Sequence, residues 1–177
     1  MKTTRKIIFA ALLASLTCVA TMLIKIPSPL NGYLNLGDAV VLLSGFLLPM
    51  PYAFASAAIG SALADFFSPY AFYAPATFLI KGVEALLAYF VWTAIKKLIK
   101  NEKLDILPRA IAVITGELWM ILGYFLFECI LYGFGGATLS LFGNMLQGIG
   151  CGSCAIILIG TLYPIKAIKV LFPTLSK

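Results

Sequence analysis

The chain contains apolar stretches long enough to cross a lipid bilayer. A transmembrane helix needs about 20 predominantly apolar residues. Of the 177 residues, 62% are hydrophobic and only 11% are charged, and the mean hydropathy is +1.02. Soluble domains carry roughly a quarter of charged residues. The sequence therefore predicts an integral membrane protein and excludes a soluble globular domain.

Turn residues divide the apolar sequence into six segments. We expect an all-α, six-helix bundle forming one membrane domain over residues 1–177, with spans at about 6–26, 38–48, 52–67, 76–95, 107–132 and 137–163. The second and third segments are short and are separated by Pro49 and Pro51. A half-length helix is stable at membrane depth only when its ends are buried in protein or line a cavity. This short pair favours a binding fold.

Basic residues predict the orientation of the bundle. With a cytoplasmic N-terminus, eleven of the thirteen Lys and Arg residues fall on one side, near the two termini and in the segment from Lys96 to Arg109. Loops rich in Lys and Arg stay in the cytoplasm. Both termini are therefore expected to be cytoplasmic, with loops at 27–37, 68–75 and 133–136 outside.

Several chemistries lack the residues that they need. The sequence has no histidine, which is the commonest metal ligand and general base. Cys151 and Cys154 form a C-x-x-C pattern without a second pair, so we expect them to pack in a helix. No phosphate-binding loop motif occurs. We therefore predict no enzymatic activity, no cofactor, no metal and no nucleic-acid partner, and any ATP hydrolysis would belong to another chain.

Polar and charged side chains recur within the last three predicted spans. Such residues are costly in lipid and normally face a cavity or one another. Under the predicted orientation, most of them lie at a similar depth below the external surface, beneath loops that contain Asn and Tyr. We expect a small polar ligand site formed by Asn31, Tyr33, Asn35, Tyr73, Lys81, Glu84, Tyr124, Glu128, Asn144 and Gln147.

Some of these residues have a simpler interpretation. Lys81 and Glu84 lie three residues apart on one helix face. They can neutralise each other, or pair with Glu128, in a purely structural role. Asp38 follows Gly37 and is expected to cap a helix N-terminus. Asp65, at the end of the third span, is expected to be structural.

Small residues recur at every fourth position of the first span, at Ala10, Ala14 and Cys18. This spacing lets another helix approach closely in a membrane. A similar stripe in the third span contains Ala53, Ala57 and Ser61. Packing inside the bundle explains such a stripe, and so does docking on a partner subunit. The first span, at Ala10 and Ala14, is the better candidate for docking.

The order of several motifs resembles a known family. These are the Ala10 and Ala14 pair, the segments GYLNLGDAVVLLSGFLLP and IGSALADFFSPYAFYAPATFLIKGVEALLAYF, and GNMLQG in the last span. Together they resemble the substrate-binding S component of energy-coupling factor (ECF) vitamin transporters, in the group with riboflavin, hydroxymethylpyrimidine and pyridoxine members. The clustered tryptophans and the histidine of thiamine-binding members have no counterpart here.

The resemblance implies a vitamin-binding subunit in the bacterial plasma membrane. It also implies docking through Ala10 and Ala14 on a transmembrane coupling (T) subunit, with two ATP-binding-cassette ATPase subunits. Two other hypotheses remain open from the residues. One is an ion-coupled carrier, acting alone or as a homodimer, with Lys81, Glu84 and Glu117 as the coupling site. The other is a membrane enzyme with Asp38 and Asp65 as an aspartyl pair, which the sequence supports least.

Overall fold

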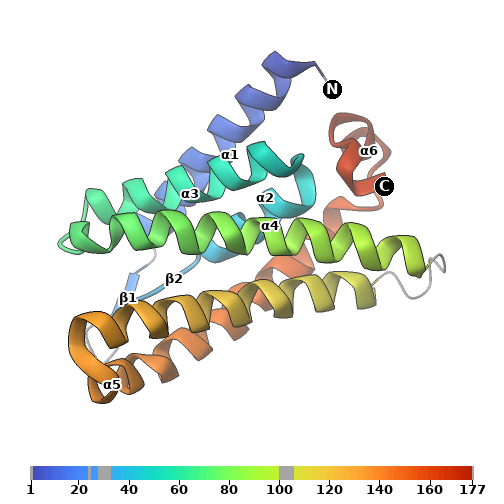
Figure 1. Cartoon of the computed structure of the whole chain (residues 1–177). Coiled ribbons are helices and arrows are strands. Elements are labelled where there is room, and N and C mark those ends of the chain that lie inside the picture. The colour runs from blue at the N-terminus through green and yellow to red at the C-terminus, as the bar shows by residue number, and fades with distance from the viewer. Residues whose placement is uncertain (1, 24, 28–32, 100–105, 177) are drawn as a thin grey trace.

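The long helices in the middle and C-terminal parts of the chain run roughly along one direction, and the N-terminal helix lies oblique to them (Figure 1). The computed structural model describes residues 2–23, 25–27, 33–99 and 106–176. The elements are α1 (Thr3–Leu23), β1 (Lys25–Pro27), β2 (Tyr33–Asn35), α2 (Gly37–Leu47), α3 (Met50–Phe66), the 3-10 helix η1 (Ala71–Tyr73), α4 (Ala74–Leu98), α5 (Ile106–Leu162), α6 (Lys166–Leu171) and the 3-10 helix η3 (Pro173–Ser176). Three helices in the described part, Thr3–Leu23, Ala71–Leu98 and Ile106–Leu162, are long and apolar enough to cross a membrane.

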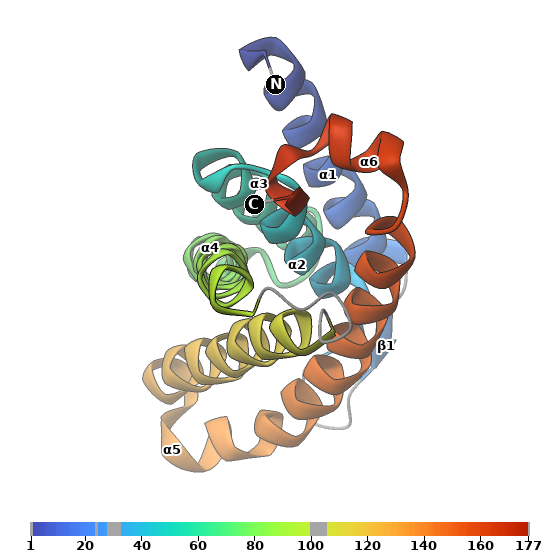
Figure 2. The same ribbon diagram turned by 90° about the vertical axis from the view of Figure 1, so that its right-hand side faces the viewer.

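The long helix α5 reverses direction at one residue. Gly133 has φ 73° and ψ 171°, a backbone conformation that essentially only glycine adopts. It divides α5 into two arms, 106–132 and 134–162, which lie side by side in both views (Figures 1 and 2). The turn expected at 133–136 is therefore a break at a single glycine.

A two-stranded hairpin differs from the expected all-α fold. Strands β1 and β2 pair antiparallel, with Lys25 opposite Asn35 and Pro27 opposite Tyr33. The prediction that the first span reaches residue 26 is therefore wrong, because α1 ends at Leu23. The physical reason lies in Pro27, which disfavours helical backbone at the preceding Ile26. The hairpin leads the chain into α2 and places Asn35 above its first turn.

The short helix α2 lies at the centre of the molecule (Figure 2). All eleven of its residues are buried, and it contacts α1, α3, α4 and α5. Gly45 allows the close approach of α4, because a Cβ atom there would lie 2.5 Å from the carbonyl oxygen of Ala85. A short helix surrounded by other helices satisfies the condition that the sequence imposed on half-length segments.

The two ends of the bundle differ in their residues. Both termini, the end of α4, the start of α5 and helix α6 gather at one end (Figure 1). The hairpin, the α3–η1–α4 turn and the reversal between the two arms of α5 lie at the opposite end. We call these the terminal end and the hairpin end. The basic residues at the end of α4, at the start of α5 and in α6 belong to the terminal end: Lys96, Lys97, Arg109, Lys166 and Lys169. The polar pocket described next lies toward the hairpin end.

Candidate functional site

A polar pocket lies between the helices toward the hairpin end. Its walls come from α1, β2, α2, α3, the η1 region, α4 and both arms of α5. The lining residues are Thr21, Asn35, Asp38, Ser61, Asp65, Tyr70, Tyr73, Thr77, Lys81, Tyr124, Glu128, Asn144 and Gln147. All of them carry a hydrogen-bonding side-chain group, so the pocket suits a ligand with several polar atoms.

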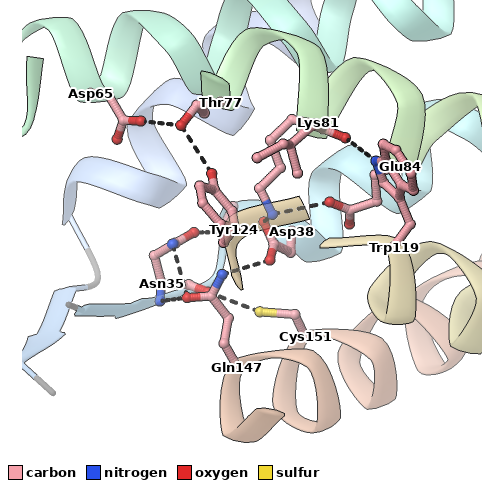
Figure 3. A network of polar contacts seen from close by, with 12 residues as sticks. Asn35, Asp38, Asp65, Thr77, Lys81, Glu84, Trp119, Tyr124, Gln147 and Cys151 are labelled. Carbon is pink, nitrogen blue, oxygen red and sulfur yellow. Dashed lines mark hydrogen bonds and ion pairs between the residues drawn. The ribbon is translucent and has the colours of Figure 1, made fainter. Parts of the chain in front are cut away.

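Lys81 is the main cation of the pocket wall. Its Nζ atom lies 2.5 Å from Asp38 Oδ1 and 3.0 Å from Glu84 Oε2 (Figure 3). All three side chains are buried, with exposures of 4% or less. Lys81 and Asp38 line the pocket, while Glu84 lies behind them. The pairing expected between Lys81 and Glu84 is therefore present, and it is extended by a second carboxylate from α2.

Gln147 joins the second arm of α5 to the start of α2. Its Nε2 atom donates to Asp38 Oδ2 at 2.6 Å, and its Oε1 atom accepts from both nitrogens of Asn35 at 3.1 Å (Figure 3). Asn35 in turn accepts from the backbone N–H of Gly37 at 2.8 Å. One turn along α5, Cys151 donates to the Asn35 carbonyl at 2.9 Å. These bonds hold the hairpin, α2 and α5 in fixed positions around the pocket.

A second polar chain crosses from α3 to α5. Thr77 donates to Asp65 Oδ2 at 2.5 Å, and its hydroxyl lies 3.0 Å from that of Tyr124 (Figure 3). The Tyr124 ring lies beneath the Lys81 ammonium, 5.4 Å from the ring centroid, which is the distance of a cation–π contact. Asp65 thus takes part in the pocket wall through its bond to Thr77.

Three tyrosine rings, those of Tyr70, Tyr73 and Tyr124, line the pocket. Tyr73 packs against Tyr70 and Tyr124 with ring centroids 6.4 Å apart in each pair. Its hydroxyl donates to Glu128 Oε1 at 3.2 Å, and Glu128 also accepts from Ser140. Tyrosine offers both an apolar face and a hydroxyl to a ligand. The pocket can therefore hold a flat ring system against these tyrosines.

Asn144 presents a polar group that its surroundings leave unsatisfied. Its Nδ2 atom is buried and finds no acceptor among the described residues. A buried donor without a partner costs about 1–3 kcal/mol. Because Asn144 lines the pocket, an acceptor atom on a ligand would remove that cost.

Three carboxylates lie close together beside the pocket. Single oxygens of Asp38, Glu84 and Glu117 lie within 4.8 Å of one another, and all three residues are buried. Within the described chain, neither oxygen of Glu117 has a hydrogen-bond partner. Lys81 supplies positive charge to this group through Asp38 and Glu84.

The structure brings together most of the residues predicted to bind ligand. Glu84 lies behind the pocket wall, whereas Asn31 and the side chain of Tyr33 are outside the described residues. The others all line the one pocket: Asn35, Tyr73, Lys81, Tyr124, Glu128, Asn144 and Gln147.

Sequence reasoning missed several lining residues and assigned one of them wrongly. Asp38 does not cap α2, because the N-cap position is Leu36 and the first backbone N–H of the helix, that of Gly37, donates to the Asn35 side chain. The Asp38 carboxylate turns instead to Lys81 and Gln147. A single acid in an otherwise apolar helix was the available signal. The other missed residues carry small hydroxyls or an acid, which occur in many spans: Thr21, Ser61, Asp65 and Thr77.

The small-residue stripes take two different positions. Ala53, Ala57 and Ser61 of α3 are buried inside the bundle. Ala10 and Ala14 of α1 line an apolar groove between α1 and α3 on the outside of the bundle. Other residues of this groove are Ala11, Ser15, Cys18, Ala55, Ile59 and Leu63. The α1 stripe therefore borders this groove, although Ala10 is itself buried, whereas the α3 stripe serves internal packing.

Three comparisons show which known proteins this chain is similar to. Residues 1–164 match the family model of the ECF-type riboflavin transporter S component. A Pyrococcus woesei protein described as "Uncharacterized protein in gap 3'region" is 35% identical over 133 residues, which is 74% of this chain and 83% of that protein. The solved structure of the S component of a bacterial ECF transporter shares the fold, with a TM-score of 0.67 and 23% identity over 91% of this chain and 96% of that one. The chain therefore belongs to the family of ECF-type riboflavin transporter S components, membrane-embedded proteins that bind a transported substrate.

Proposed function

We propose that this protein captures a riboflavin-type vitamin, or a smaller precursor such as a hydroxymethylpyrimidine or pyridoxine, in the pocket at the hairpin end. The observation that carries the proposal is the unsatisfied Asn144 amide in a pocket bordered by tyrosine rings. Heterocyclic vitamins have flat rings with carbonyl or nitrogen acceptors at their edges. The tyrosines would cover the ring faces, and Asn144 would read one edge. Riboflavin is the first ligand to test, because the matching family is named for it.

The remaining predicted residues would act in two ways. Two tyrosines, Tyr73 and Tyr124, would present ring faces and hydroxyl groups to the ligand, and Glu128 would present its carboxylate. Asp38 pairs with Lys81 and accepts from Gln147, which also bonds Asn35. These bonds would hold this part of the pocket wall in position, and the remaining polar atoms of the same residues would contact the ligand. Glu84 would contribute only through Lys81. Asn31 and Tyr33 would contact the ligand from the predicted external loop at 27–37.

We propose that transport requires a T subunit and two ATP-binding-cassette ATPase subunits. The groove containing Ala10 and Ala14 is a suitable place for a helix of the T subunit, because its small residues permit close helix approach. The proposed orientation, with both termini in the cytoplasm of a bacterial cell, follows from the basic residues. It agrees with the position of both termini at one end of the bundle.

An ion-coupled carrier is the second candidate function. Glu117 favours it, because a buried carboxyl group without a partner in the described structure is an expected feature of a proton or cation site. In this version, Lys81, Glu84 and Glu117 would bind the coupling ion.

Uptake into membrane vesicles distinguishes the two functions. Vesicles that hold this protein with T and ATPase subunits should accumulate radiolabelled riboflavin only when ATP is supplied inside. Vesicles with this protein alone, given a proton or sodium gradient, should not. Uptake driven by a gradient without the partner subunits would refute the ECF assignment of mechanism and favour the ion-coupled carrier.

A further inference from the structure

Three cationic side chains converge on one aromatic ring at the terminal end. The Nζ atom of Lys169 lies 3.9 Å from the Tyr163 ring centroid, and that of Lys96 lies 4.4 Å from it. The Cζ atom of Arg109 lies 4.7 Å from the same point. The three residues belong to α6, α4 and α5, respectively. Elements far apart in the sequence therefore bring their positive charges to one place.

The aromatic residues form a rigid base for these charges. Lys96 donates to the Tyr163 hydroxyl at 2.5 Å and also lies 5.1 Å from the Trp92 ring centroid. Trp92 is fully buried and packs edge-on against Tyr163, with centroids 6.2 Å apart. Phe172, just after α6, packs against Phe9 of α1 at 4.6 Å. These contacts fix α6, and with it Lys169, against the end of the bundle.

Positive charge exceeds negative charge at this end of the molecule. Five of the seven acidic residues, Asp38, Asp65, Glu84, Glu117 and Glu128, belong to the bundle described above, which leaves only Glu102 and Asp105 in the sequence between α4 and α5. Among the described residues, the terminal end has no acidic residue and has these basic residues: Lys2, Arg5, Lys6, Lys96, Lys97, Arg109, Lys166 and Lys169. Local ion pairs cannot neutralise this excess, whatever partners the individual side chains have. The three groups around Tyr163 also repel one another, since each lies within 4.7 Å of one point.

We propose that Lys96, Arg109 and Lys169 bind a phosphate group at the terminal end, carried either by the headgroup of an anionic phospholipid or by a free phosphate ester. Arginine offers a fork of donors that matches phosphate oxygens, and lysine adds compact positive charge. Basic pockets between membrane helices on the cytoplasmic side are suited to anionic headgroups. Tyr163 is of a residue type that favours the membrane–water interface. This site is separate from the vitamin pocket and does not depend on the proposed function.

Paired lysine variants test the site. The double variant Lys96→Gln/Lys169→Gln removes two of the convergent charges. The control Lys97→Gln/Lys166→Gln removes the same charge from neighbouring positions of α4 and α6 that are exposed and make no ring contact with Tyr163 among the contacts described. Purified proteins are compared by native mass spectrometry for retention of phosphatidylglycerol against phosphatidylcholine. Circular dichroism melting verifies that each variant is folded.

We expect the wild-type protein and the control to retain phosphatidylglycerol in preference to phosphatidylcholine. The convergent variant should bind it at least tenfold more weakly, and Lys96→Arg/Lys169→Arg, which keeps the charge, should bind like the wild type. If the convergent variant does not fold, Arg109→Gln takes its place with the same expectation. A parallel titration with inorganic phosphate distinguishes the source: competition at millimolar concentration assigns the site to free phosphate esters, and no competition assigns it to lipid. Equal losses in both double variants, or no binding of lipid and phosphate by the wild type, would overturn the proposal.

Discussion

At the scale of single residues, Asn144 and Gln147 have the same chemistry but different surroundings. Both are amides lining the pocket from the second arm of α5. The amide nitrogen of Gln147 donates to Asp38 and its amide oxygen accepts from Asn35. The amide nitrogen of Asn144 has no acceptor in the described structure. One amide is therefore part of the framework, and the other is available to a ligand.

We predict that Asn144→Ala weakens riboflavin binding about tenfold or more, because one lost ligand hydrogen bond of about 1.4 kcal/mol corresponds to one decade. The melting temperature without ligand should stay unchanged or rise. Gln147→Ala should instead lower the melting temperature, because it leaves Asp38 and Asn35 with unmet bonds. Calorimetric titration and thermal melting measure the two effects. Identical affinity in wild type and Asn144→Ala would remove Asn144 from the site.

Lys81 is expected to matter more for stability than for contact with ligand. Removing one partner of a buried ion pair costs about 3–5 kcal/mol, because a charge is left uncompensated. Lys81→Met should therefore lower the melting temperature strongly by stranding Asp38 and Glu84. The triple variant Lys81→Met/Asp38→Asn/Glu84→Gln removes the stranded charges and should recover most of the loss. A triple variant as unstable as the single one would show that lost packing, and not stranded charge, is the cause.

At the scale of elements, the reversal of α5 depends on the backbone of Gly133. A Cβ atom at Gly133 or at Gly135 would meet nothing within 4 Å, so the two positions differ in backbone conformation and not in space. Of these two glycines, only Gly133 has a positive φ. Gly133→Ala should therefore destabilise the protein by about 1–3 kcal/mol, while Gly135→Ala should be neutral or slightly stabilising. Unfolding in mixed micelles compares the two. Equal effects would mean that the turn tolerates other residues.

The sequence predicted the helical segments well and the hairpin not at all. Apolar length and turn residues mark α1, α3, α4 and both arms of α5, because burial in lipid demands such stretches. The strands β1 and β2 have only three residues each, and their pairing depends on where α1 and α2 bring their ends. A pattern of two-residue period cannot be recognised in so short a run. The role of Asn35 as a link between hairpin and α5 was therefore beyond sequence reasoning, although the residue itself was selected.

At the scale of the whole molecule, the pocket combines two kinds of residue. Some can be assigned to one site from their predicted depth in the membrane, and others cannot. Lys81, Asn144 and Gln147 were predicted together because charges and amides in spans are rare and share one depth. Depth does not single out Asp38 and Asp65, because each lies at a helix end where an acid has a plausible local role. Which acid turns toward Lys81 depends on the central position of α2, and this position is a property of the assembled bundle.

The arrangement of the ends leads to a prediction about orientation. In a variant without the four native cysteines, a cysteine replacing Phe72, which is 54% exposed near the hairpin end, should react with a membrane-impermeant thiol reagent in intact cells. A cysteine at position 100 should react only after the membrane is opened. The reverse pattern would place the pocket on the cytoplasmic side.

The proposed function requires that this chain alone binds the vitamin, without ATP hydrolysis or an ion gradient. Calorimetric titration of the purified protein with riboflavin, in detergent and without ATP, partner subunits or an ion gradient, tests it most directly. We predict saturable binding of one riboflavin per chain, with a dissociation constant of about 1 μM or lower, or about −8 kcal/mol and stronger. No saturable binding of riboflavin, hydroxymethylpyrimidine or pyridoxine under these conditions, or binding that appears only when sodium ions or protons are supplied, would contradict the account.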